Sequence, residues 1–149
     1  LIITQTLSKA YGLAGIRLGV CYASEAIISI LNKIKPPYNV NALTQQKALE
    51  RLLEINKVKQ EVKTLISERE VLIKALGDLK FIGKIYPSDA NFILMKVDDA
   101  NLRYRQLIAE GIVVRNRTNQ PLCENCLRIT VGTPDENKKL IKTLKYLDQ

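Results

Sequence analysis

The chain has 149 residues, the length of one domain of ordinary size, and 46% of them are apolar, which is enough to build a core. No apolar run approaches the roughly 20 residues that span a membrane, and residues 1–9 lack the features of a signal peptide, so we expect a cytoplasmic protein without membrane contact. The 23 basic and 15 acidic residues leave a net charge of +8, which suits nucleic-acid binding. The basic residues are scattered, however, and many stand at helix-neighbour spacing from acidic ones. This favours a solvated helix face and no nucleic-acid partner.

Three cysteines and the absence of histidine limit the chemistry further. Without histidine, no Ser–His or Cys–His catalytic arrangement can form within the chain. Cys123 and Cys126 form a lone C-x-x-C motif, but tetrahedral zinc needs four ligands and only Cys21 is left over. We therefore expect two small side chains in a loop there, no disulfide framework and no metal site.

The first part of the chain predicts two strands around a glycine-rich turn. Residues 1–7 are apolar and β-branched, and residues 17–23 form a second apolar run, so both ranges are expected to be buried strands. Ser24 is placed to cap a short helix, which the sequence Lys35-Pro36-Pro37 should end. Two strands cannot make a sheet with two covered faces, so this part is expected to belong to a larger sheet.

Residues 44–77 predict one long helix. Thr44 is placed to cap it, apolar residues keep close to helical spacing, and Gly77 is placed to end it. At about 1.5 Å per residue, such a rod is on the order of 50 Å long. It is too long for a small domain, so we expect it to bridge two domains or to lie across one. A coiled coil is the alternative, but the flanking charges are irregular.

The rest of the chain alternates between strands and helices and predicts a small α+β unit. The expected strands are residues 81–86, 91–97, 112–115 and 127–131, and a helix is expected over 102–110. Thr133 and Glu136 form a capping box with Pro134 at the first helical position, which predicts the last helix.

The stretch SKAYGLAGIRLG places Lys9 between a predicted buried strand and the glycine-rich turn. Ligands sit at strand ends in open α/β sheets, and a desolvated lysine there can act as an amine nucleophile on a carbonyl. Thr6, Ser8 and Arg17 supply two hydroxyls and a guanidinium, which are groups that hold a phosphate. A reactive lysine beside a phosphate site is typical of pyridoxal phosphate enzymes. The alternative is a surface lysine next to a structural glycine turn.

The longer segment TLSKAYGLAGIRLG resembles the cofactor-lysine motif of fold-type-I, aspartate-aminotransferase-like enzymes. The T-x-S-K and G-L-A-G sequences match, as does an arginine eight residues after the lysine. The resemblance implies that Lys9 binds the cofactor covalently and is the catalytic residue. It further implies that Thr6, Ser8 and Arg17 bind the phosphate of pyridoxal 5'-phosphate.

Arg115 and Arg128 each stand at the end of a predicted strand, and two guanidinium groups facing one site would bind a dianion. The alternative is two exposed strand-end arginines. The segments PSDANFIL, GIVVRNRTNQPL and CLRITVGT resemble the C-terminal region of histidinol-phosphate aminotransferases, and the resemblance covers essentially the whole chain. It implies that Arg128 holds the position that binds the substrate carboxylate in related enzymes. With Arg115, it would bind the substrate phosphate.

The resemblance implies an α/β fold, namely the C-terminal part of a fold-type-I transferase. Residues 1–55 would be a remnant of the large cofactor-binding domain, with the start of the long helix, and residues 56–149 the small C-terminal α+β domain. Members of the family are more than twice this long, so we expect an incomplete portion of the enzyme, inactive by itself. The implied substrates are small molecules, L-histidinol phosphate and 2-oxoglutarate, with glutamate as a product in histidine biosynthesis, and the implied assembly is a homodimer.

Two other functions remain open at this stage. The first is another enzyme of the same fold, such as a phospho-amino-acid decarboxylase or an aromatic aminotransferase. The second is a basic, non-catalytic binding module, which would show salt-dependent DNA binding and no reactive lysine.

Overall fold

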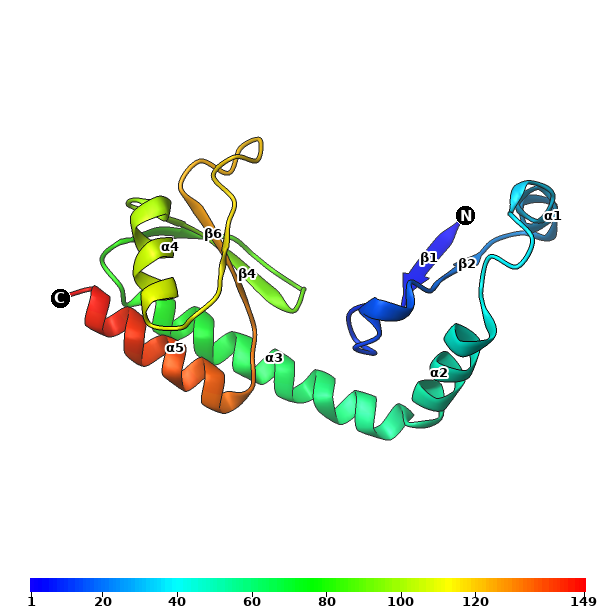
Figure 1. The fold of residues 1–149 in the computed structure, drawn as a ribbon, viewed down its shortest axis with the longest axis horizontal. Coiled ribbons are helices and arrows are strands. Elements are labelled where there is room, and N and C mark those ends of the chain that lie inside the picture. Colours follow the sequence, from blue (N-terminus) through cyan, green and yellow to red (C-terminus); the bar gives the residue numbers. More distant parts are fainter. The chain divides into compact units, whose positions relative to one another are not determined.

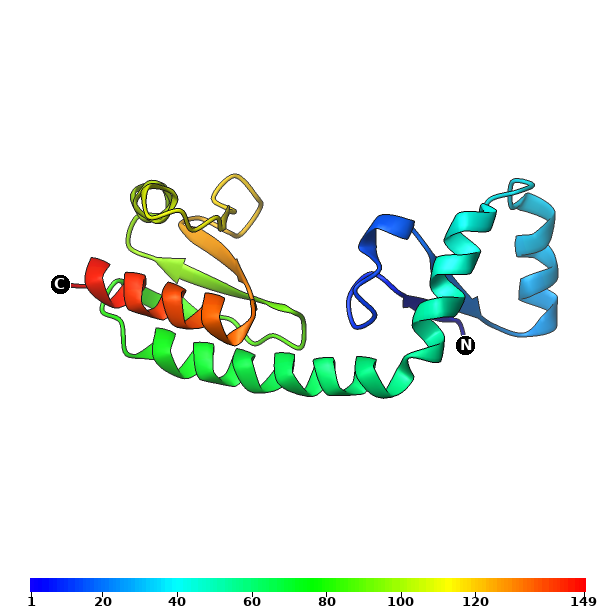
Figure 2. The ribbon, with the colours of Figure 1, turned by 60° about the horizontal axis from the view of Figure 1, so that its bottom comes forward.

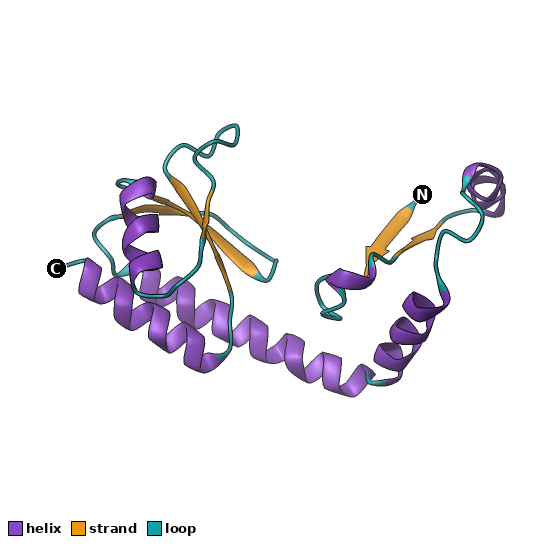
Figure 3. Ribbon diagram, viewed as in Figure 1, coloured by secondary structure: helices purple, strands orange, loops and turns teal.

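The computed structural model describes residues 1–149, which divide into two units, Leu1–Val62 and Lys63–Gln149 (Figure 1). Both units combine helices with strands, as Figure 3 shows, so the predicted α/β character is confirmed. The assignment of these units to the domains of a larger enzyme, with a boundary after residue 55, stays a prediction. None of the helices has the length and apolar character needed to cross a membrane.

Unit 1 is built on a two-stranded antiparallel hairpin. β1 (Ile3–Thr6) pairs with β2 (Gly19–Tyr22), and the connection contains a short 3-10 helix, η1 (Ala14–Ile16). Both predicted strands are confirmed, at narrower bounds. All four residues of β1 are exposed within the unit, however, so the expected burial of this strand is not found here. Two helices follow, α1 (Glu25–Ile34) and α2 (Ala42–Leu53).

The predicted long helix is two helices. α2 ends at Leu53, and α3 (Ile55–Gly77) begins after a break at Glu54. At the break, the N–H of Glu54 bonds to the carbonyl of Arg51, a tighter turn than that of an α-helix, while the Glu54 carbonyl starts α3 by accepting from Val58. Because the apolar spacing continues through this single residue, periodicity alone does not reveal the break.

The cap of α2 is also different from the prediction. Asn41 is the N-cap, and its side-chain oxygen accepts a 2.9 Å hydrogen bond from the backbone N–H of Thr44. Thr44 therefore lies inside the first turn, three residues after the cap. Asparagine and threonine both cap helices well, so the sequence offered two candidates and the structure uses the earlier one.

Unit 2 contains a four-stranded antiparallel sheet in the order β3-β4-β6-β5. The strands are β3 (Ile82–Ile85), β4 (Phe92–Val97), β5 (Arg115–Asn116) and β6 (Cys126–Thr130). α4 (Ala100–Ala109), α5 (Pro134–Leu147) and the later turns of α3 cover one face of it, and Figure 2 shows α3 and α5 side by side. Apolar residues from this face and from the three helices form the core.

β5 is shorter than the strand expected over residues 112–115. The backbone N–H of Ile112 bonds to the carbonyl of Leu107 at the end of α4, so this segment continues the helix terminus and reaches the sheet only at Arg115. α4 begins at Ala100, two residues before the expected start, because the Asp99 side chain caps it by accepting from the N–H groups of Asn101 and Leu102.

The capping box of α5 is confirmed. The Thr133 hydroxyl accepts from the N–H of Glu136, and the Glu136 carboxylate accepts from the N–H of Thr133 at 2.7 Å. These bonds hold the pKa of Glu136 below its ordinary value. The cap fixes the point at which the chain leaves β6 and turns into α5.

Candidate functional site

Lys9 lies in a tight turn that begins where β1 ends. Its carbonyl accepts a 2.9 Å bond from the N–H of Gly12, which has a φ of +69° that only glycine adopts without strain. The N–H of Leu13 closes the turn on the carbonyl of Leu7, also at 2.9 Å. The Lys9 residue is exposed within unit 1. The turn therefore presents this lysine at the end of the hairpin, as the sequence predicted.

Two hydroxyl groups lie next to each other beside Lys9. The Thr6 hydroxyl donates to the Ser8 hydroxyl at 2.8 Å, and the Ser8 N–H donates to the Thr6 hydroxyl at 3.1 Å. Because these bonds hold the two oxygens close together, both can contact one phosphate group.

Arg17 reaches the same end of the hairpin from the other strand. The N–H of Leu7 bonds to the carbonyl of Leu18 at 3.3 Å, and this pair brings Ser8 and Arg17 to the same end of the ladder. Arg17 has a left-handed backbone (φ +54°), and its Nη1 donates to the carbonyl of Ala14 at 3.2 Å. The structure thus places all four predicted residues of unit 1 at the same end of the hairpin.

Two side chains of α2 bond to the connection between β1 and β2, which contains the lysine turn and η1. The Nε of Arg51 donates to the carbonyl of Tyr11 at 2.9 Å, and the Thr44 hydroxyl donates to the carbonyl of Ile16 at 3.4 Å. Arg51 also forms ion pairs with Glu61 and Glu54, and the hydrogen bonds to Glu61 first and Glu54 second raise the pKa of its guanidinium. Sequence analysis missed both contacts, because no local pattern joins α2 to a turn that lies far back along the chain.

In unit 2, Arg115 of β5 and Arg128 of β6 are direct cross-strand partners. Between Arg115 and Arg117, Asn116 donates from its side chain to Asn101 of α4 at 2.8 Å, so Asn116 faces the helices. Because side chains alternate along a strand, Arg115 and Arg117 face the opposite, uncovered side of the sheet. Arg128 faces that side as well, since its neighbours Leu127 and Ile129 are buried in the core.

Arg128 is half-buried, whereas its cross-strand partner Arg115 is exposed. The Arg128 guanidinium lies over the ring of Phe92, 4.9 Å from the centroid, and its Nε is buried without a hydrogen-bond partner. Burial lowers the pKa of Arg128, and the charges of Arg117 and Arg115 lower it further. An unpaired buried donor costs free energy, and an anion bound here would supply the missing acceptor.

Arg117 is a residue that sequence analysis did not select. Its N–H bonds to the carbonyl of Cys126 at 2.8 Å, which extends the pairing of β5 with β6 by one step. None of the ion pairs in the structure includes Arg115, Arg117 or Arg128. The alternation Arg-Asn-Arg at a strand was the signal that could have identified Arg117.

The C-x-x-C motif forms a turn next to this cluster. The N–H of Cys126 bonds to the carbonyl of Cys123 at 3.0 Å, and both thiols are free. Cys126 is buried, and burial raises the pKa of its thiol. No group of metal-ligating side chains gathers anywhere in the structure. The expected loop is found at Cys123, whereas Cys126 is the first residue of β6, so the expectation of a loop is wrong for Cys126.

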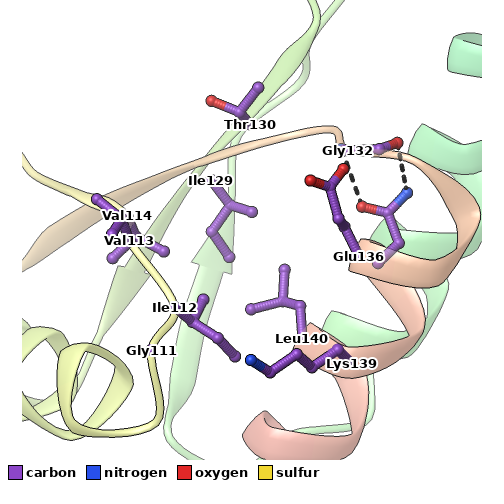
Figure 4. A pocket seen from close by; sticks show the side chains of 11 residues that line it. Gly111, Ile112, Val113, Val114, Ile129, Thr130, Gly132, Glu136, Lys139 and Leu140 are labelled. Carbon is purple, nitrogen blue, oxygen red and sulfur yellow. Dashed lines mark hydrogen bonds between the residues drawn. The ribbon is translucent and has the colours of Figure 1, made fainter.

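A cavity of about 420 Å³ lies where residues 111–114 pass the start of α5 (Figure 4). Leu140, Ile112 and Ile129 contribute its apolar wall, and Glu136 and Lys139 lie at its edge. The dashed lines in Figure 4 mark two hydrogen bonds. The N–H of Gly132 donates to the side-chain oxygen of the buried Asn137, and the side-chain amide of Asn137 donates to the carbonyl of Gly132. None of the three arginines lines this cavity. The cavity and the arginine cluster are therefore separate features of unit 2.

Comparison with known proteins identifies the family of the chain. The family model described as aminotransferase class I and II matches residues 1–144. The histidinol-phosphate aminotransferase of Flavobacterium johnsoniae is 68% identical over 148 residues, which cover 99% of this chain and 42% of that protein. The predicted resemblance is confirmed, and the chain spans less than half the length of the curated relatives it matches.

Solved structures show the same fold. The L-threonine-O-3-phosphate decarboxylase from Porphyromonas gingivalis is 25% identical with a TM-score of 0.79, and the match covers 100% of this chain and 47% of that one. The histidinol-phosphate aminotransferase from Sinorhizobium meliloti, solved in complex with pyridoxal-5'-phosphate, is 22% identical with a TM-score of 0.80, covering 98% and 41%. The predicted fold class, part of a fold-type-I transferase, is confirmed. Because the family model matches residues 1–144, nearly the whole length, the chain belongs to the aminotransferase class I and II family.

Proposed function

We propose that the protein carrying this chain transfers the amino group of L-histidinol phosphate to 2-oxoglutarate, with pyridoxal 5'-phosphate as cofactor. The observation that carries the proposal is the cross-strand pair of Arg115 and Arg128, which has no acidic partner and suits a phosphate-bearing substrate. The choice of substrate is supported by the name of the relatives, up to 68% identical. A cytoplasmic location, a role in histidine biosynthesis and a homodimer are parts of the same proposal.

The turn of unit 1 fits the two groups by which pyridoxal phosphate would be held, its carbonyl and its phosphate. The amine of Lys9 is exposed and takes part in none of the ion pairs, so it is available to a carbonyl carbon. Thr6 and Ser8 offer adjacent hydroxyls, and Arg17 offers a cation at the same end of the hairpin. When bound, the cofactor supplies an electron sink for the charge that develops at the substrate α-carbon.

The chain's own residues then have distinct tasks. The amine of Lys9 is the general base that takes a proton from the α-carbon of the amino donor, and in the second half of the reaction the same group delivers a proton to the α-carbon of 2-oxoglutarate. Arg115 and Arg128 bind the phosphate of the amino donor by charge-assisted hydrogen bonds. In the second half of the reaction, the same arginines bind a carboxylate of 2-oxoglutarate. Arg51 keeps the turn that carries Lys9 in place, and Thr44 holds the adjoining helix η1.

A phospho-amino-acid decarboxylase is a second candidate, because the arginine pair suits any phosphate monoester. The likeness to the decarboxylase of Porphyromonas gingivalis is the observation in its favour. Its identity of 25% is far below the 68% shared with the Flavobacterium johnsoniae aminotransferase, so we place transamination first.

Borohydride reduction tests the cofactor assignment. The protein carrying this chain is incubated with pyridoxal phosphate, reduced, digested and mapped by mass spectrometry, with Lys9→Arg as the matched control. We expect one phosphopyridoxyl group on the peptide of Lys9 and none in the control. Labelling spread over exposed helix lysines such as Lys59 and Lys63 would contradict the assignment.

A substrate assay tests the reaction. The same protein is supplied with L-histidinol phosphate and 2-oxoglutarate, and glutamate formation is measured. We expect glutamate in proportion to the donor consumed. Release of CO2 from an O-phospho-amino acid, without glutamate formation, would assign the decarboxylase function in its place.

A further inference from the structure

The uncovered face of the unit 2 sheet carries one more arginine than the proposed function uses. Arg117 follows Arg115 by two positions, and the helix-facing contact of Asn116 with Asn101 sends both arginines to the uncovered face. The N–H of Arg117 bonds to the carbonyl of Cys126, which stands two positions before Arg128 on β6. Arg117 and Arg128 are therefore diagonal neighbours across the β5–β6 pair, a distance that long side chains span.

The electrostatics agree with this placement. The pKa of Arg128 is lowered first by burial, then by the charge of Arg117, and only then by the charge of its direct partner Arg115. Arg117 is half-buried, and no carboxylate forms an ion pair with it. Three guanidinium groups thus share one face of a sheet without a counter-charge, an arrangement that destabilises the protein until an anion binds.

The number of cations points to the charge of the ligand. A carboxylate has one negative charge and two oxygens, which one or two guanidinium groups satisfy. A phosphate monoester carries up to two charges near neutral pH and has three terminal oxygens. Both groups would be bound in turn if the enzyme uses a phosphorylated donor and a dicarboxylic acceptor. A third cation then favours the phosphate over the carboxylate.

We propose that Arg117 is a specificity-determining residue of the arginine cluster, which makes the site prefer a phosphate monoester dianion to a carboxylate. This inference rests on the proposed function and assigns Arg117 to the amino-donor half of the reaction. Arg115 and Arg128 bind both substrates, whereas Arg117 adds affinity for the doubly charged group alone.

The test compares Arg117→Gln with the unchanged protein in steady-state kinetics. Because a lost charge-assisted bond weakens binding, we expect the KM for L-histidinol phosphate to rise about tenfold, with the KM for 2-oxoglutarate and the kcat changed less than about threefold. Arg117→Lys keeps the charge but lacks the planar guanidinium. Its KM for L-histidinol phosphate should therefore lie between those of the unchanged protein and Arg117→Gln. Arg105→Gln, on the exposed side of α4, is the matched control and should leave both KM values unchanged.

A pH titration supplies a second readout. The second ionisation of a phosphate monoester has a pKa of about 6, so its binding to the unchanged protein should strengthen as the pH rises from about 5 to about 7.5. In Arg117→Gln this gain should shrink, because the residue that prefers the dianion is gone. Inorganic phosphate, titrated against the protein by calorimetry, reports the preference for a dianion without turnover, at a somewhat higher pH because its second ionisation occurs at a higher pH.

The outcomes separate the inference from the proposed function. If the unchanged protein transaminates the phosphorylated donor and Arg117→Gln has the same KM and pH response, the inference alone is wrong. An equal rise of both KM values would also overturn it, since that marks a general disturbance of the sheet. If the unchanged protein does not use the phosphorylated donor, the proposed function and the inference fall together.

Discussion

The Nε of Arg51 donates a 2.9 Å hydrogen bond to the carbonyl of Tyr11, forty positions earlier in the chain. Tyr11 stands in the turn that carries Lys9, so this bond ties α2 to that turn. The Arg51 side chain is only 14% exposed, and its remaining donors bond to Glu54 and Glu61. The guanidinium of Arg51 is thus bonded through all three of its nitrogens, and Arg51 acts as a positioning residue for the lysine turn.

Replacing Arg51 should loosen that turn. In Arg51→Met, the Tyr11 carbonyl loses its donor while the length of the side chain is kept, so the amide N–H groups of Gly12 and Leu13 should exchange with solvent faster. Labelling of Lys9 by pyridoxal phosphate and borohydride should slow as well. Lys47→Met is the matched control, because Lys47 bonds only to the exposed Glu50 of its own helix. Equal exchange in the two variants would show that Arg51 does not hold the turn.

Removing the amide of Asn137 should destabilise unit 2. Asn137 is 2% exposed, and it bonds to the N–H and carbonyl of Gly132 and to the Glu68 carboxylate. In Asn137→Ala, these buried groups lose their partners, which should cost about 2–3 kcal/mol in the free energy of unfolding. Urea denaturation followed by circular dichroism measures the loss. Asn119→Ala, in an exposed loop, should change the same free energy by less than about 0.5 kcal/mol.

Gly132 and Gly77 should respond differently to a methyl group. A Cβ on Gly132 would lie 2.8 Å from an oxygen of Glu136 and 3.0 Å from its Cβ, so Gly132→Ala must push Glu136 out of the capping box. We expect the Tm to fall by about 5 °C. A Cβ on Gly77 meets nothing within 4 Å, so Gly77→Ala, at the end of α3, should keep or raise the Tm. Equal melting shifts would contradict the steric argument.

The pair of Asp98 and Arg103 should make the stability of unit 2 depend on pH. The hydrogen bonds to Arg103, the closest 2.7 Å long, hold the pKa of Asp98 below its ordinary value. A lowered carboxyl pKa stabilises the fold above the unfolded pKa, and this contribution is lost as the pH falls through the folded pKa. Asp98→Asn should therefore be less stable than the unchanged chain at pH 7 and equally stable near pH 2. A stability difference that persists at low pH would point to packing as the cause.

Local sequence signals predicted the local structure well. The capping box of Thr133 and Glu136 depends on residues within one turn, and the structure contains it as expected. The turn after β1 likewise depends on residues that are close together in the sequence, since Gly12 supplies the positive φ that the chain needs there. The same locality explains why Thr6, Ser8, Lys9 and Arg17 were found together. Their roles toward a cofactor stay predictions.

The contacts that sequence analysis missed join residues that are far apart or depend on one exact register. Arg51 and Tyr11 meet only through the fold of unit 1. The sequence predicted that Arg115 and Arg128 each stand at the end of a strand. That the two residues are direct cross-strand partners follows from the β5–β6 register, which the sequence did not specify. Arg117 was passed over because β5 was expected to end at Arg115. The sequence of a short apolar segment does not determine where its strand begins and ends, because hydrogen bonds to distant parts of the chain decide this.

The core of unit 2 has a consequence for the order in which the molecule unfolds. Every buried member of that core lies between Leu72 and Leu144, so unit 2 buries its apolar residues without any from unit 1. Unit 1, by contrast, buries little beyond Leu7, Ala48 and Val58. Heated by itself, this chain should therefore melt in two steps, with the amides of β4 and β6 as the last to exchange for deuterium. The arginine cluster, carried by β6 and by β5 with the residue that follows it, belongs to this persistent part of the chain, whereas the lysine turn belongs to the part that opens first.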